Sequence, residues 1–306
     1  MKNKCNFLKE EKGNVLLLFT LSFMFIIGVA GLVIDGGILY NTKSHLKKTA
    51  NAAVLSGAQE ILMSNNSVNE VVNKILMAHG EENSVKELKI RPNNENILRL
   101  ELQRDVPLYF MKFFKINSIK VNVAASATLV TMSGGIGAVP LGIDENVPLE
   151  FMKEYKLKVD SGDSTYGNFG ILALSGPGAK LYEQDLTYGY EGELKVGDII
   201  ETQTGNIEGK TRNAINARIA ACPYTVDYIE HRDCSRVVLI LVYKPHSIAS
   251  NQLKSVEITG FAYFYIKEPM SSQDSSITGY FIKQSGSGSG DSSIINKGAY
   301  VIKLTE

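Results

Sequence analysis

The 306-residue sequence has no tryptophan, only three cysteines and four histidines, and no excess charge, since 32 basic residues balance 32 acidic ones. It contains no Cys-x-x-Cys pair and its histidines are scattered, so neither a disulfide-dense scaffold nor a zinc cluster is expected. The balanced charge gives no reason to expect nucleic acid or an acidic substrate as a partner. The length fits about two domains of ordinary size.

Charged side chains are also missing from residues 14–34, a run of 21 predominantly apolar positions. As a helix this run would be about 31 Å long, which matches the hydrocarbon thickness of a bilayer. It predicts a single transmembrane helix. One alternative is a buried core helix, and another is a signal peptide cleaved at Gly28-Val29-Ala30, although the run exceeds the usual apolar region of about 7 to 15 residues.

Four lysines precede the apolar run, at positions 2, 4, 9 and 12. Basic residues flanking a membrane span favour the cytoplasmic side, and the neighbouring glutamates count little. The sequence therefore predicts a cytoplasmic segment 1–13, and it predicts that everything after the span is extracytoplasmic.

A helical stripe of mostly small residues follows the span. Its members are spaced by four, three, four and four residues: Leu46, Ala50, Ala53, Gly57 and Ile61. Small side chains allow close approach of a neighbour, which is either the core of the same chain or a second molecule. Gly36 and Gly37 are expected to kink or break the helix between span and stripe, or to leave one bent rod.

The run GNVLLLFTLSFMFIIGVAGLVIDGG, followed by LKKTANAAVLSGAQEI, resembles the N-terminal segment of the Tad (tight adherence) family, the TadG-like Flp pilus assembly proteins. The residues that carry the resemblance are Gly13, Asp35, Gly36, Ala50, Ala52, Ala53, Leu55, Gly57 and Ala58. It covers about the first 60 residues and implies a bitopic component of pilus assembly or related surface machinery. Leu18 occupies the position where a prepilin-type cleavage site would need glutamate, so processing as a structural pilin is not implied.

Residues 35–132 are predicted to form a small, pilin-like α+β domain. A capping box at 67–70 predicts a short helix, residues 98–102 and 119–127 alternate as strands do, and Pro107 is expected in the first turn of a short helix at 106–111. The stretch 106–129 also resembles the segment that closes this domain in Tad-like proteins.

Residues 133–137 (SGGIG) predict a linker to a mainly β domain at 138–306, in which only 211–221 has the pattern of a helix and 285–293 is expected to be a flexible loop. The predicted strands are 155–159, 169–174, 196–202, 236–243, 256–267, 278–283 and 299–304. Phrases such as GNFGILALSGPGA resemble C-terminal regions of Tad-like proteins and imply no activity.

Cys222 and Cys234 lie in the predicted extracytoplasmic half, where an oxidising environment favours a disulfide. The alternative is a nucleophilic cysteine assisted by His231 or His246 and by Asp227 or Asp233. A calcium site from Asp144, Glu145, Glu150, Asp160 and Asp163 has no recognisable ligand spacing, and no cofactor site is predicted.

The leading hypothesis is a non-enzymatic, membrane-anchored component of a Tad/Flp-type pilus or a related apparatus. Its expected partners are the membrane, other pilus or secretion components and, through the N-terminal helix, a second copy. One alternative is a membrane-tethered envelope enzyme with a cysteine nucleophile. Another is a polysaccharide-binding module that uses Tyr166, Tyr182, Tyr188 and Tyr190 as a stacking surface.

Overall fold

The computed structural model describes residues 14–92, 95–158, 169–203, 207–224, 233–249, 252–271 and 276–305. The expected cytoplasmic segment 1–13, with Gly13, lies outside these residues. The chain divides into two compact units: unit 1 comprises residues 1–61, 65–127 and 304–306, and unit 2 comprises 62–64 and 128–303.

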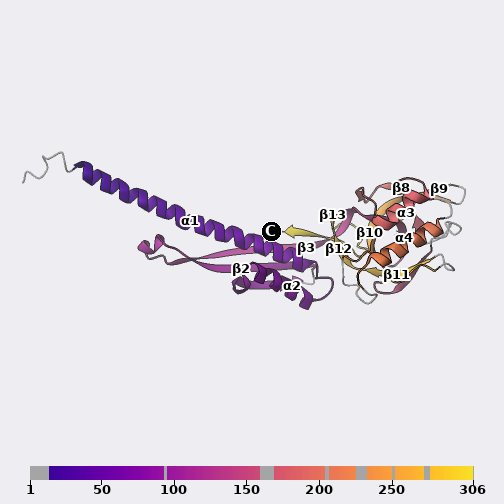
Figure 1. Cartoon of the computed structure of the whole chain (residues 1–306), viewed down its shortest axis with the longest axis horizontal. Coiled ribbons are helices and arrows are strands. Elements are labelled where there is room, and N and C mark those ends of the chain that lie inside the picture. The colour runs from indigo at the N-terminus through magenta and orange to yellow at the C-terminus, as the bar shows by residue number, and fades with distance from the viewer. Residues whose placement is uncertain are drawn as a thin grey trace, which may run out of the picture. The chain divides into compact units, whose positions relative to one another are not determined.

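Helix α1 (Asn14–Ala58) is continuous over 45 residues and runs through Gly36 and Gly37 without interruption (Figure 1). Of the two alternatives predicted from sequence, the break at these glycines was wrong, and one continuous helix joins the span to the stripe. Each glycine costs about 1 kcal/mol relative to alanine inside a helix, but tertiary contacts on both sides of the pair outweigh this cost. On the N-terminal side of the glycine pair, Asp35 is buried and hydrogen-bonded to residues 109–111. On the C-terminal side, the stripe that begins at Leu46 is buried.

Helix α2 (Asn65–Ala78) buries one face, formed by Val68, Val72 and Leu76, and is followed by the short 3₁₀ helix η1 (Glu82–Ser84). The helix begins before the predicted capping box, so Ser67 lies in its first turn and not at its N-cap. The amphipathic pattern thus predicted the helix correctly but not its first residue.

The sheet of unit 1 contains β1 (Val85–Ile90), β2 (Ile97–Pro107) and residues 118–127 of β3 (Ser118–Gly135). The short helix predicted at 106–111 was misplaced, because Val106 and Pro107 end β2 and the helical turn η3 (Met111–Phe114) comes later. Hairpin pairing explains the shift: the Leu108 N–H donates to the Asn117 carbonyl at 2.9 Å, so the strands stay paired up to their connection.

The core of unit 1 lies between α1, α2 and β2. Leu98, Leu100 and Leu102 alternate along β2 and are fully buried, as the period of two predicted. The opposite wall is the stripe of α1, whose small residues let helix and sheet approach closely.

Unit 2 is built on a sheet in which the strand order is β5-β11-β10-β9-β4-β6, with β8 paired to β10. Its strands are β4 (Ala138–Asp144), β5 (Glu154–Lys158), β6 (Phe169–Ile171), β8 (Ile199–Glu201), β9 (Val237–Ala249), β10 (Gln252–Ile266) and β11 (Ser276–Ile282). β4 and β9 are parallel, and the other pairs are antiparallel. Four further strands belong to the same sheet as β3 and not to the sheet above: β7 (Leu194–Lys195), β12 (Gln284–Gly286), β13 (Gly288–Gly290) and β14 (Ala299–Thr305).

Both faces of this central sheet are buried. Along β9, Val238, Ile240 and Val242 pack in one cluster with helices α3 (Ala179–Tyr188) and α4 (Glu208–Ala221). The alternate residues of β9, such as Leu239 and Leu241, pack in a second cluster with Met132 and with Ala299 and Val301 of β14. A strand that is buried on both faces has the continuous apolar run VVLILVY seen here.

Three features of unit 2 differ from the sequence predictions. α3 was missed, and the expected linker 133–137 begins inside β3. The expected flexible loop 285–293 contains β12 and β13. Glycines explain both misreadings, because Gly134 and Gly135 pair with Gly288 and Ser289 across adjacent strands, where a Cβ would meet neighbouring atoms. Glycine here allows close backbone approach and is not a sign of a linker.

Candidate functional site

The N-terminal part of α1 presents an unbroken apolar surface to its surroundings. Large apolar side chains between Val15 and Ile34 are 44% to 74% exposed. Almost none of this apolar surface is buried within the chain, and α1 alone, among the helices that the structure describes, is long and apolar enough to cross a membrane. Core helices of soluble proteins bury such side chains, so this surface needs an apolar environment outside the chain.

Two residues at the C-terminal end of this surface, Gly31 and Asp35, are buried. They lie four positions apart, so they share one face of the helix. Both contact the connection between β2 and β3, residues 108–117, which we call the collar. η3 is part of the collar, and its contact with α1 is a contact within unit 1.

The Asp35 carboxylate accepts hydrogen bonds from three consecutive backbone N–H groups of the collar. Oδ1 accepts from Tyr109 at 2.9 Å, and Oδ2 accepts from Phe110 at 2.9 Å and from Met111 at 2.8 Å. Asp35 is only 2% exposed. Hydrogen bonds to an ionised acceptor are stronger than neutral ones, so a charged side chain of the helix holds a loop that has no strand partner of its own.

Gly31 makes room for the ring of Phe110. A Cβ at position 31 would lie 2.5 Å from Cγ and 2.8 Å from Cβ of Phe110, closer than carbon atoms can approach. Any larger residue would push the ring away from the helix. Gly31 and Asp35 therefore have complementary roles. Gly31 leaves space for the Phe110 ring of the collar, and Asp35 binds the collar backbone.

The stripe of α1 beyond this point lies inside unit 1. Ala50 and Ala53 are fully buried, as are Leu46, Ala58 and Ile61. A Cβ at Gly57 would lie 2.6 Å from Cγ2 of Val72 and 2.8 Å from Cδ2 of Leu98. The neighbour that approaches these small residues is thus α2 and β2 of the same chain.

The remaining residues of the predicted motif differ in their surroundings. Leu55 is half-buried, and Gly36 is exposed, with no atom within 4 Å of a Cβ placed there. Gly31 and Phe110 were missed by sequence reasoning. The spacing Gly-x-x-x-Asp at the end of the apolar run is a signal that could have identified Gly31, whereas nothing local marks Phe110 as its partner.

A shallow groove of about 330 Å³ lies beside the collar, between α1 and the end of β2. Its lining mixes apolar side chains with polar and charged ones, including His45, Arg104 and Asp105. Arg104 pairs with the buried Glu81 at 2.8 Å, and His45 lies 3.5 Å from the same carboxylate. The opposite charges offset each other, so the groove does not favour an anion or a cation.

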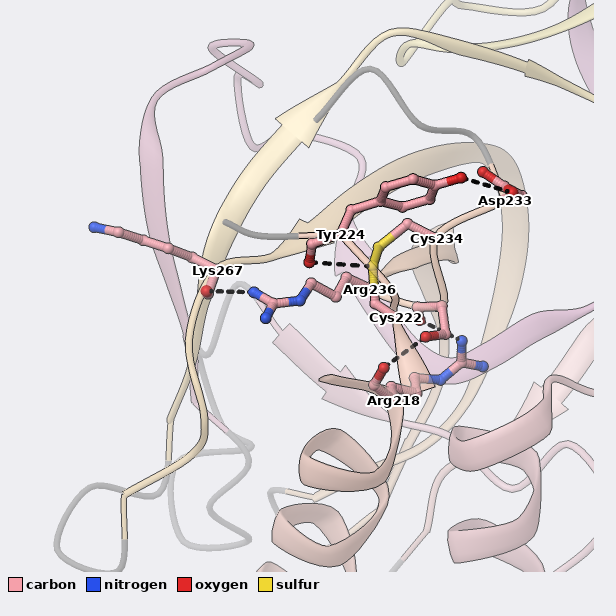
Figure 2. Close-up of a disulfide and its surroundings, with 8 residues drawn as sticks. Arg218, Cys222, Tyr224, Asp233, Cys234, Arg236 and Lys267 are labelled. Atoms are coloured by element: carbon pink, nitrogen blue, oxygen red, sulfur yellow. Dashed lines mark hydrogen bonds between the residues drawn. A yellow bond between two sulfur atoms is a disulfide. The ribbon is translucent and has the colours of Figure 1, made fainter. Parts of the chain in front are cut away.

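In unit 2, Cys222 and Cys234 form the predicted disulfide, with a Cα–Cα distance of 5.0 Å (Figure 2). It joins the C-terminal end of α4 to the segment that leads into β9. Cys234 is buried and packs against Tyr265 and Ile282. Closing a loop of this length stabilises a fold by about 3 kcal/mol on the chain-entropy estimate.

Arg218, on α4, reinforces the same junction. Its side chain is buried and donates to the Leu186 carbonyl at 2.5 Å and to the Ser235 carbonyl at 3.0 Å, while Ser235 Oγ donates back to the Arg218 carbonyl at 2.6 Å. Burial lowers the pKa of Arg218 to about 10, which still leaves it charged at neutral pH. These hydrogen bonds tie α3, α4 and the segment that leads into β9 together.

The structure gives other roles to Cys222, Cys234 and Tyr182, three of the residues on which the alternative chemistries predicted from sequence depend. The disulfide leaves neither Cys222 nor Cys234 as a free thiol. Of their four suggested partners, Asp227 and His231 lie outside the described residues, whereas Asp233 and His246 lie within them. Tyr182 is buried and hydrogen-bonds to Thr211 Oγ1 at 3.2 Å, so it cannot stack on a sugar, and burial raises its pKa. Tyr166 lies outside the described residues.

Two of the suggested calcium ligands have other contacts. Asp144 accepts hydrogen bonds from Asn146, and Glu150 pairs with Lys153 at 2.8 Å. Asp160 and Asp163 lie outside the described residues. Among the residues that the structure describes, no group of three His, Cys, Asp or Glu side chains could hold a metal ion.

These features define a class: a chain with one N-terminal helix able to cross a membrane, whose continuation is the central helix of a folded α+β unit, with a mainly β unit in addition. Residues 13–60 match the family model Tad, described as "Putative Flp pilus-assembly TadE/G-like". Neither the curated proteins nor the solved structures contain a match to the chain. The matched segment includes the span, Gly31, Asp35 and most of the stripe, and together with the apolar helix it supports a membrane-anchored, pilus-related role.

Proposed function

We propose that the protein is a non-enzymatic, single-pass component of a Tad/Flp-type pilus assembly system or a related surface apparatus. The observation that carries the proposal is the double character of α1. Its first half exposes an apolar surface of bilayer length, and its second half is the core of unit 1. One rigid element thereby links membrane insertion to the fold, and the family match of residues 13–60 supports the pilus context.

The proposed orientation has residues 1–13 in the cytoplasm and both units outside, with the span retained and not cleaved. The basis is the excess of lysine before the span and the disulfide in unit 2, which forms in oxidising compartments. An exposed surface residue of unit 2 such as Tyr188, which is 83% exposed, offers a reporter site.

Orientation is tested by the variant Tyr188→Cys in a Cys5→Ser background. We expect an impermeant thiol reagent to label it in cells whose outer layers are permeable and whose cytoplasmic membrane is intact. The matched control is the parent with Cys5 retained and no added cysteine, which should be labelled only after lysis. Labelling of the Tyr188→Cys variant only after lysis would reverse the orientation.

The partner in the apparatus is proposed to bind unit 1 or unit 2 outside the membrane. The stripe is covered by α2 and β2, so an association between copies through α1 would use its exposed surface, of which the apolar span is the largest part. Crosslinking in cells from exposed positions of unit 2, with identification of what is captured, tests this: pilus or secretion components are expected. If deletion of the gene left piliation, adhesion and secretion unchanged while the system is active, the assignment would fail.

A further inference from the structure

The collar carries a cluster of exposed aromatic and basic side chains. Phe113 is 86% exposed, Phe114 is 72% exposed and Tyr109 is 61% exposed. Lys112 and Lys115 are exposed in the same turn, and the Lys112 ammonium lies 5.7 Å from the centre of the Tyr109 ring. Phe113 and Phe114, which we call the patch, expose large apolar surface on one helical turn. Exposure of such surface to water is unfavourable.

The position of this cluster along α1 is fixed by contacts within unit 1. Phe110 lies against Gly31 and the backbone of residues 109–111 is bound to Asp35, so the collar is level with the last turn of the apolar span. From residue 15 to residue 34 the helix rises by about 29 Å, which is the hydrocarbon thickness of a bilayer. With α1 spanning the bilayer as proposed above, residues 31–35 and the collar lie at the boundary between hydrocarbon and water.

In Figure 1 the β2–β3 hairpin extends along α1 toward its N-terminal half, with the collar as its tip. Aromatic rings and lysines are the side chains that favour this boundary: the rings enter the headgroup region, and the ammonium groups extend toward lipid phosphate. The cluster has this composition and lies at this depth.

We propose that the collar is a second membrane contact, in which Phe113 and Phe114 insert into the headgroup region of the bilayer that α1 spans, with Lys112 and Lys115 facing lipid phosphate. This inference rests on the proposed membrane span. With two attachment points, the tilt and rotation of α1 are restricted, and unit 1 is held in one orientation above the membrane. The collar is bound to α1 at the last turn of the apolar span, through Gly31 and Asp35, which favours lipid over a protein partner as the occupant of the patch.

The absence of tryptophan provides a direct test, because a single introduced tryptophan is a unique fluorophore. Three full-length variants are reconstituted into vesicles of phosphatidylcholine and phosphatidylglycerol: Phe113→Trp in the collar, Phe23→Trp in the span and Tyr188→Trp in unit 2. Phe114→Trp serves as a second collar reporter. Emission is recorded with phosphatidylcholine brominated near the headgroup or deep in the chain, and with acrylamide in the water phase.

We expect the Phe113→Trp and Phe114→Trp variants to emit at shorter wavelength than the Tyr188→Trp variant, and to lose more emission to shallow than to deep bromines. The Phe23→Trp variant should respond most to deep bromines, and the Tyr188→Trp variant should respond only to acrylamide. Collar reporters that behave like the Tyr188→Trp variant, while the Phe23→Trp variant is quenched by lipid, would overturn this inference and leave the membrane anchor intact.

A Phe23→Trp variant that no brominated lipid quenches would instead reject the anchor itself. Collar emission that is insensitive to bromine but shifts as the ratio of protein to lipid rises would show that another copy of the chain covers the patch, which also overturns the lipid assignment.

Discussion

Removal of the Asp35 carboxylate is expected to release the collar from α1. In the Asp35→Ala variant three backbone N–H groups, those of residues 109–111, lose their acceptor at once. The collar has little to replace it, since these groups face the helix and not a neighbouring strand. The Asp35→Asn variant keeps one acceptor oxygen but places an NH₂ group against an N–H, so it should have an intermediate effect.

The magnitude follows from the three bonds, which are 2.8 to 2.9 Å long. Losing one hydrogen bond to a charged acceptor changes an equilibrium by a factor of roughly 10 or more, and the three effects are not additive because the released loop gains contact with water. We therefore expect opening of the collar to become roughly 100-fold more frequent in the Asp35→Ala variant and roughly 10-fold more frequent in the Asp35→Asn variant.

Amide hydrogen exchange of the full chain in lipid nanodiscs measures this opening directly. The expected result is faster exchange of Tyr109, Phe110 and Met111, with little change in Leu98 to Leu102 of β2, because those residues are held by the sheet. The matched control is Asp105→Ala, at an exposed carboxylate near the end of β2. Exchange at 109–111 that is the same in the Asp35→Ala variant, the control and the parent would refute the role given to Asp35.

Three further outcomes are expected. The Gly57→Leu variant should destabilise unit 1 by about 1 to 3 kcal/mol or prevent its folding, because the new side chain meets Val72 and Leu98. The control Gly36→Ala should be neutral or slightly stabilising, because no atom lies near its Cβ position. Thermal unfolding distinguishes the two variants, and equal melting temperatures would contradict the packing described for Gly57. Cys222 and Cys234 should resist alkylation until a reductant is added, and the Cys222→Ser variant should lose about 3 kcal/mol of unfolding free energy in denaturant titration. The Arg218→Met variant should lose about 2 to 4 kcal/mol of unfolding free energy, because two buried carbonyls lose their hydrogen-bond donor. The control Arg212→Met removes a partly exposed ion pair on the same helix and should change the unfolding free energy by under about 1 kcal/mol.

The elements that the sequence predicted well are those with a strong period. The alternation in Leu98, Leu100 and Leu102 identified β2, and the spacing from Leu46 to Ile61 identified the buried face of α1. In both cases one side of the element is buried and the other is not, so apolar residues recur in the sequence with the period of the element.

The misread segments are those in which distant residues determine the conformation. Gly134 and Gly135 were interpreted as a linker because glycine is common in linkers, but their role depends on Ser289 and Leu194, whose atoms lie 2.5 and 3.2 Å from a Cβ at Gly134. Helix α3 was missed because it is short and buries only Tyr182, Asp185 and Leu186. A local pattern cannot reveal a contact made more than 150 residues away.

The candidate site shows the same limit in one place. Asp35 and Gly36 were identified through the family resemblance, but Gly31 was not, although it contacts the same loop as Asp35. If both residues hold one collar, their effects must be coupled. We predict that Gly31→Ala raises exchange at Phe110 in the parent, by displacing its ring, but raises it much less in the Asp35→Asn background, where the collar is already loosened.

The control for this coupling is Gly57→Ala, which acts on the same helix at a distance of roughly 33 Å from position 35, given a rise of 1.5 Å per residue. Residues this far apart with no shared partner act additively, so Gly57→Ala should change collar exchange by the same small factor with or without Asp35→Asn. Gly28→Ala, one turn before Gly31 and with no atom near its Cβ position, should leave the collar unchanged. Strict additivity of Gly31→Ala and Asp35→Asn would mean that they act on separate structures, and the description of the collar as one unit held at two points would then be wrong.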